Sequence, residues 1–202
     1  MVHPSSPPKH PQRLADLSPF ADLTLLPTFS TWAHVTMLHM YLLVVRFRCF
    51  DAPAQQAWQA ALVNHFFYQA EAKMEDVHEL SSRAIRQRYL KDLFVQWRGL
   101  MLACDEGVVK GDAVLASAVW RNLFKAREDV DVRALAAVVA WMRAGVERLG
   151  EMTDERVEMG GSVSGAGETA GGGLFPSVTE AFGVVDLPAA VMRVAFEKAG
   201  IR

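Results

Sequence analysis

Cysteine is scarce in this sequence of 202 residues, which contains only Cys49 and Cys104. The two lie far apart, and neither belongs to a CxxC motif or to a Cys/His spacing typical of a metal site. A disulfide framework is therefore not expected, and a reducing compartment is favoured. A nucleophilic role for Cys104 is disfavoured as well, because the adjacent Asp105 and Glu106 oppose formation of the thiolate.

An excess of one charge is also lacking, since the net charge is −2 at pH 7. This balance implies no general affinity for nucleic acid, and DNA is not expected as a partner. The sequence has no Gly-rich phosphate loop, no GxSxG and no HExxH, so the chain is not expected to be an enzyme and no cofactor is expected. One alternative is a metal-dependent helical enzyme with His39, His65 and Glu71 as ligands, although their spacing matches no established ligand set.

An uncharged run from Leu23 to Val45 is nearly long enough to cross a bilayer. Pro27 interrupts it, and its histidines and threonines lower its hydrophobicity. We interpret it as a buried or membrane-touching helix, with a membrane-anchored structural subunit as a second alternative. The first 30 residues contain no apolar signal region and no transit-peptide pattern. Any import signal is therefore expected outside this chain.

Helical periodicity dominates the rest of the sequence, and 51% hydrophobic residues suffice for a core. The pattern predicts an all-α fold, a single bundle of about five main helices. The expected organisation has four parts: a disordered Pro-rich arm (1–22), a helical domain (23–158), a Gly-rich linker (159–174), and a C-terminal segment that can form a short helix (175–202). The five helices are expected at about 29–47, 52–77, 82–104, 112–124 and 131–149.

The first predicted helix carries a polar file, Thr36, His39 and Arg46, on an otherwise apolar helix. Burying such groups without partners costs a few kcal/mol each, on the order expected for unsatisfied polar groups. The file is therefore either a satisfied core network, which we favour, or a partner-facing surface, or a ligand site. We expect Gly107 to end the third helix in a left-handed conformation.

Asp105 and Glu106 then lie at a helix C-terminus, where negative charge is unfavourable. We therefore expect them to pair with a cation, for which Arg46 and Arg121 are candidates. If Arg46 is that buried partner, its removal should destabilise the fold strongly.

The third predicted helix also has a basic face, opposed only by Asp92. Such a face is either simply solvated or contacts a ribosome, RNA or anionic lipid headgroups. Its residues are Arg83, Arg86, Arg88, Lys91 and Arg98. The acidic end of the second helix, with Glu75, Asp76 and Glu79, is expected to be solvated or to face a basic group.

Three collinear blocks resemble the ubiquinol–cytochrome c chaperone family, in a form that looks fungal and mitochondrial. They are TMLHMYLLVVR (36–46, preceded by Phe29 and Trp32), NHFFYQAEAKM (64–74) and the long block from 89 to 124. The resemblance implies a non-catalytic assembly factor for respiratory complex III. It further implies a small partner protein, newly made cytochrome b as client, the mitochondrial ribosome as a neighbour, and peripheral contact on the matrix side of the inner membrane.

The signature positions of these blocks are the candidate partner- or client-binding residues, together with two methionines that suit an adaptable apolar face. They are Trp32, Thr36, Met37, His39, Met40, Arg46, Asn64, His65, Glu71, Asp105, Glu106, Trp120 and Arg121. Candidate ribosome or lipid contacts are Arg83, Arg86, Arg88 and Lys91. We expect the exposed surface of the first helix, with Trp32, Met37 and Met40, to meet the client.

Overall fold

The computed structural model describes residues 23, 25–26, 28–76 and 82–158, and the expected arm, linker and C-terminal segment lie outside these residues. The described part is all-α, as predicted, with five main helices and one short helix. Their bounds are α1 Phe29–Phe47, α2 Ala52–Asp76, α3 Arg83–Lys110, α4 Asp112–Asn122, α5 Val132–Gly150 and α6 Asp154–Glu158.

The starts of two helices follow from local capping. The Thr28 side chain accepts a hydrogen bond from the Thr31 backbone N–H at 3.1 Å and begins α1. The Asp131 carboxylate accepts from the Arg133 N–H at 2.8 Å and begins α5, at the start of the range expected for the fifth helix. These side chains satisfy N–H groups that have no partner inside the helix.

The boundary between α3 and α4 corrects one prediction. Gly107 is helical, and α3 continues to Lys110, where Gly111 at φ +111° allows the chain to turn into α4. Gly107 is needed for a different reason, because a Cβ there would lie 2.5 Å from the Leu115 Cα. Glycine at this position allows the backbones of α3 and α4 to approach each other closely.

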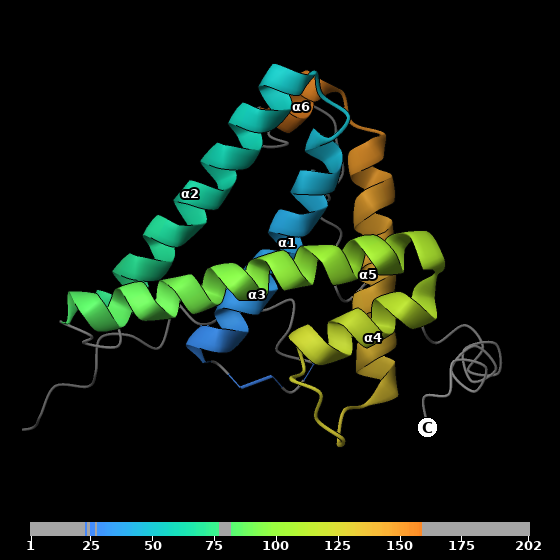
Figure 1. The fold of residues 1–202 in the computed structure, drawn as a ribbon. Coiled ribbons are helices and arrows are strands. Elements are labelled where there is room, and N and C mark those ends of the chain that lie inside the picture. The colour runs from blue at the N-terminus through green and yellow to red at the C-terminus, as the bar shows by residue number, and fades with distance from the viewer. Residues whose placement is uncertain (1–22, 24, 27, 77–81, 159–202) are drawn as a thin grey trace, which may run out of the picture.

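Two layers are visible in Figure 1, where the long α3 crosses in front of α1 and α5. Helix α1 packs against α5, α4 packs against both α3 and α5, and α2 contacts α1 and α3. The core lies between α1, α3, α4 and α5 and includes Tyr41, Trp97, Leu115 and Trp141. Short α6 lies beside the beginning of α2 at one end of the molecule, where Val157 packs near Phe47 and Phe50.

The predicted apolar faces are largely correct, with exceptions at helix ends. In α3, Leu93, Trp97, Leu100 and Cys104 are buried, whereas Ile85 and Tyr89 are exposed. The buried stripe therefore begins later in α3 than its periodicity suggests. The first residue of α5, Val132, is also half exposed.

Candidate functional site

The polar file of α1 is satisfied largely by its own helix. The Thr36 hydroxyl donates to the Trp32 carbonyl at 2.8 Å, and His39 Nδ1 lies 2.9 Å from the Val35 carbonyl. The His39 ring also meets the edge of Trp141, with centroids 4.7 Å apart. Burial lowers the pKa of His39, which favours the neutral ring that donates to Val35. The geometry thus supports the core interpretation of these two residues.

Arg46 is buried and ties α1 to the end of α5, not to the acidic pair of α3. Its Nε donates to the Leu149 carbonyl at 2.9 Å, and its Nη2 donates to the Met152 carbonyl at 2.8 Å. The same nitrogen pairs with Asp154 of α6. The predicted pairing of Arg46 with Asp105 or Glu106 is therefore wrong, because the guanidinium is directed at the backbone carbonyls at the end of α5.

Asp105 and Glu106 have different cations. Asp105 accepts two hydrogen bonds from Arg48, at 2.7 and 2.9 Å, and one from the buried Tyr41 hydroxyl at 3.1 Å. Burial and then the charge of Asp105 raise the pKa of Tyr41. Glu106 accepts from Lys110 at 2.6 Å on the surface. Each acid near the end of α3 thus has a partner, as expected, although Arg46 is not that partner.

Cys104 lies just before this acidic pair and is buried. Burial, followed by the charge of Asp105, raises the pKa of its thiol to about 12. A nucleophilic thiolate is therefore disfavoured here, in the direction that the sequence indicated.

The Trp120–Arg121 candidate lies on α4. The half-buried Trp120 donates its indole N–H to the Arg127 carbonyl at 2.7 Å, which fixes the loop before α5. Arg121 is exposed and, after the larger effect of Lys110, helps to lower the pKa of Glu106. Of these two side chains, Arg121 is the one more available to a partner.

The expected client face of α1 is corrected by burial. Met37 and Met40 lie in the core, so neither presents an adaptable surface to a client in this fold. Trp32 is half buried, stacks on Phe66 of α2 at 5.8 Å, and has the Lys73 ammonium 5.0 Å from its ring centroid. Trp32, Phe66 and Lys73 thus join α1 to α2.

The candidates on α2 are divided between solvent and the contact with α3. Asn64 and His65 are exposed, and His65 Nε2 lies 2.8 Å from the Gln69 side-chain amide. Glu71 and Glu75 flank the buried guanidinium of Arg86, at 3.7 and 3.6 Å. Of the acidic residues expected at the end of α2, Glu75 therefore faces a basic group, one of the two outcomes expected, whereas Glu79 lies outside the described residues. Arg86 is buried between carboxylates and does not belong to a solvent-facing basic surface.

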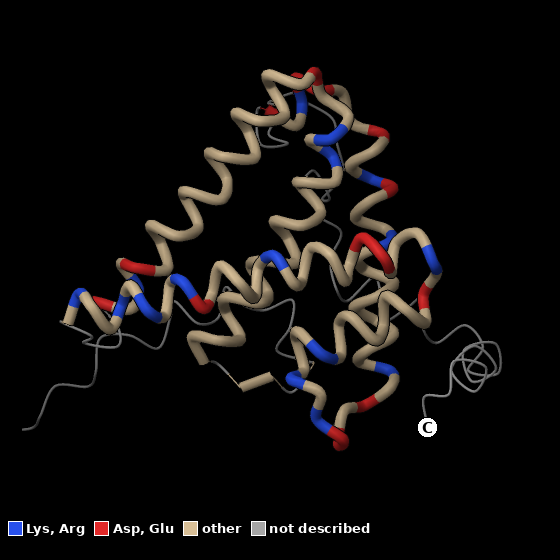
Figure 2. The backbone as a smooth tube through the Cα atoms, in the orientation of Figure 1, with Lys and Arg blue, Asp and Glu red and all other residues tan. Residues whose placement is uncertain are grey.

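The remaining cations of α3 form a basic patch that stays exposed. Within the described part of the chain, none of its members makes an ion pair. Figure 2 shows cations along α3 from its start to just past its midpoint, with carboxylates gathered where α2 ends. The basic patch consists of Arg83, Arg88, Lys91 and Arg98.

An apolar groove lies between α2 and α3 beside this patch, with a volume of about 420 Å³. Phe94 forms part of its wall, is 44% exposed, and contacts Phe67 at 5.9 Å between ring centroids. The α2–α3 groove is lined by Gln56, Gln59, Ala60, Val63, Phe94, Trp97, Arg98 and Met101. Sequence reasoning missed this site, because its walls come from two different helices whose relative placement the sequence does not show.

The groove can bind an apolar segment but offers little chemistry. Its polar groups are two glutamines and one guanidinium, without a nucleophile or a general base. An apolar concave surface with few polar groups is typical of binding sites for apolar side chains. We therefore take the α2–α3 groove and the basic patch together as the candidate functional site.

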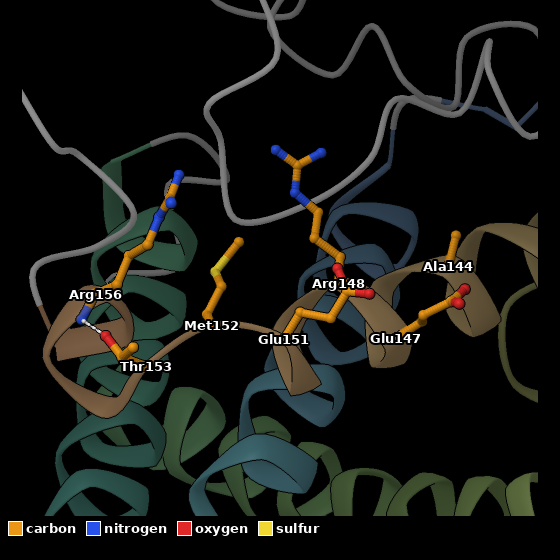
Figure 3. Close-up of a pocket in the computed structure, with 7 residues that line it drawn as sticks. All are labelled: Ala144, Glu147, Arg148, Glu151, Met152, Thr153 and Arg156. Atoms are coloured by element: carbon orange, nitrogen blue, oxygen red, sulfur yellow. Dashed lines mark hydrogen bonds between the residues drawn. The ribbon is translucent and has the colours of Figure 1, made fainter. Parts of the chain in front are cut away.

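A second hollow of about 550 Å³ lies at the end of α5 and is less suited to this role (Figure 3). Arg148 and Arg156 extend to the same side there, with Glu147 and Glu151 nearby. Two cations and two carboxylates give this site no net preference for an ion of either sign.

The described residues support neither alternative function, the metal-dependent enzyme or the membrane-anchored subunit. Among them, no three His, Cys, Asp or Glu side chains gather as metal ligands do, and His39 and His65 lie on different helices. Over the same residues, no helix combines the length and the hydropathy needed to span a bilayer.

Comparisons with known proteins place these features in context. A family model described as ubiquinol-cytochrome C chaperone matches residues 21–163. The mitochondrial protein CBP3 of Saccharomyces cerevisiae is 36% identical over 141 residues, which cover 70% of this chain and 42% of that protein. Ubiquinol-cytochrome c reductase complex assembly factor 1 of Homo sapiens is 25% identical over 137 residues, 68% of this chain and 44% of that protein.

The Xenopus laevis assembly factor 1 is 26% identical over 146 residues, 71% of this chain and 70% of that protein. The chain thus spans less than half of the length of the yeast and human relatives. No solved structure matches the chain. The family is described as a chaperone and the human and Xenopus relatives as assembly factors, not as enzymes, which confirms the prediction of a non-catalytic protein.

Proposed function

Because this chain belongs to the ubiquinol-cytochrome c chaperone family, we propose that it is a mitochondrial assembly factor for respiratory complex III. Its client is newly made cytochrome b, which it holds together with a small partner protein on the matrix side of the inner membrane. The relatives' names support a role in the assembly of complex III. The open α2–α3 groove supports the proposal that the chain holds a client protein.

The observation that carries the holding role is the open apolar groove between α2 and α3, in which Phe94 is 44% exposed. Phe94 and Met101 line the groove from α3, and Val63 lines it from α2. A transmembrane client before assembly exposes apolar helices, and an apolar groove between two helices can accept such a segment. The groove therefore replaces the surface of α1 as the proposed client site.

The basic patch supplies the proposed contact with the mitochondrial ribosome. Arg83, Arg88 and Lys91 are exposed and unpaired within the described residues, so a polyanionic surface can attract them over several ångströms. Arg86 takes no part, because it is buried against Glu71 and Glu75. The signature residues Asn64, His65 and Arg121 are exposed and remain proposed partner contacts.

The client role is tested by a mild-detergent pull-down of the tagged chain from mitochondria after a short radiolabelling of organellar translation. Labelled cytochrome b should be recovered with the parent chain. A variant with Phe94→Ser and Met101→Ser should lose most of it, whereas the control Val132→Ser on α5 should not. Equal recovery with both variants would show that the groove does not hold the client.

The ribosome contact is tested separately by co-sedimentation at several salt concentrations. Reversing Arg83, Arg88 and Lys91 to Glu should abolish an association that already weakens with salt. The control is Arg127→Glu, which replaces a cation that is paired with Asp129 in the loop before α5. If the triple variant sediments with ribosomes as the parent does, the basic patch is not the contact.

A further inference from the structure

The face of α3 directed away from the core carries a row of aliphatic side chains. Val95 is 64% exposed, Leu102 is 73% exposed, and Val109 is 85% exposed. They are spaced by seven residues, so they lie on one side of the helix about two turns apart. We call these three residues the outer stripe.

No element of the described chain covers the outer stripe. Helix α3 crosses in front of α1 and α5, and its buried residues, such as Trp97 and Leu100, face the opposite way. Single exposed aliphatic residues are common on protein surfaces. Three strongly exposed aliphatic residues at the same helical position over about 21 Å are less common, and we take them as a surface that can bind another molecule.

The pattern around the outer stripe is complementary to itself. Val95 and Val109 each lie seven residues from Leu102, and Arg98 and Glu106 each lie four residues from it with opposite charges. If a second α3 runs antiparallel across the first at Leu102, Val95 meets Val109 of the second copy. In the same register, Arg98 meets Glu106 of the second copy.

Space and charge allow this approach. A Cβ added at Gly99 would meet no atom within 4 Å, so this exposed position leaves room for the backbone of a second helix. Arg98 makes no ion pair within the described residues. Glu106 is exposed, and its surface pair with Lys110 contributes little that would resist a second cation.

From this arrangement we propose that two copies of the chain associate through antiparallel α3 helices, with Leu102 on the two-fold axis. Such an interface is isologous, since each copy contributes the same residues. A second copy fits better than a foreign helix, because the stripe already provides both members of its own ion pair. A contact built mainly on one helix pair belongs to the weak, reversible class of interfaces.

The association is tested by sedimentation equilibrium of the full chain over a hundredfold range of concentration. The parent mass should rise from one chain towards two. Leu102→Glu should remain at one chain throughout, and the control Tyr68→Glu should behave as the parent does, because Tyr68 is equally exposed on α2. A parent mass of one chain at every concentration would overturn the proposal, as would a Leu102→Glu variant that associates normally.

The register is tested by reversing the proposed ion pair. Arg98→Glu alone and Glu106→Arg alone should each weaken association about tenfold, and the double variant should restore it. A symmetric disulfide gives independent evidence. With Cys49 replaced by Ser, Leu102→Cys should form a covalent dimer under mild oxidation, whereas Tyr68→Cys should not. Failure of the double variant to recover, or equal cross-linking at both positions, would overturn the antiparallel register.

Discussion

Helices α1 and α3 use their surfaces in opposite ways. Of the 19 residues of α1, 11 are buried, and most of its buried polar groups bond within the helix, at the end of α5 or, for Tyr41, to Asp105 of α3. Of the 28 residues of α3, only six are buried, and its exposed side carries apolar residues and unpaired cations. The difference indicates that α1 maintains the fold while α3, with α2, is available for binding.

The largest expected effect is on the α1 side of this comparison. Arg46→Ala should lower the free energy of unfolding by about 3–5 kcal/mol, because it removes the buried guanidinium that donates to the carbonyls of Leu149 and Met152 at the end of α5. The matched change on the α3 side, Arg88→Ala, should alter stability by less than about 0.5 kcal/mol. Urea denaturation of both variants measures the contrast, and similar losses would contradict it.

Two glycines of α3 sharpen the comparison within one helix. Gly107→Ala should destabilise the fold by about 1–3 kcal/mol, since the new methyl group would overlap the backbone of Leu115. Gly99→Ala, on the exposed side, should stabilise the fold by about 0.5–1 kcal/mol through helix propensity. Thermal melts followed by circular dichroism should move in opposite directions. A stabilised Gly107→Ala variant would show that α3 and α4 are not in such close contact.

The smallest expected effect concerns pH and the buried histidines of α1. Burial is the main cause that lowers the pKa of His34, and the nearby Lys125 ammonium, 2.9 Å from its Nε2, acts in the same direction. Burial likewise lowers the pKa of His39. A lowered folded-state pKa means that stability is complete above the unfolded value of about 6.5 and declines as the pH falls below it.

The decline should not exceed about 1.4 kcal/mol per pH unit for each histidine. Replacing His34 by Gln should therefore reduce the slope of stability between pH 7 and pH 5. Above about pH 8, His34 and His39 are neutral in both the folded and the unfolded protein. The difference in free energy of unfolding between the His34→Gln variant and the parent should therefore not change with pH there. An unchanged slope would show that His34 does not titrate differently on folding.

The sequence anticipated much of α1 and little of the candidate site. The start of α5 near Asp131 and the apolar character of α1 were predictable because each depends on residues close in sequence, and a basic neighbour for the end of α2 was one of two expected outcomes. The α2–α3 groove was not visible, because it depends on how two helices diverge. Burial of Met37 and Met40 could not be predicted, since α1 is apolar on more than one side.

The sequence by itself determined the helical class, most helix ends and the family, because periodicity, caps and collinear motifs are local properties of the chain. Tertiary structure alone decided the partners of the charged residues. Arg46 binds the end of α5, and Arg86 lies between two carboxylates of α2, whereas the neighbouring cations of α3 remain exposed. The order of charged residues in the sequence cannot distinguish the buried, paired arginines from the exposed cations, since the partner of a buried charge depends on which helices lie adjacent in space.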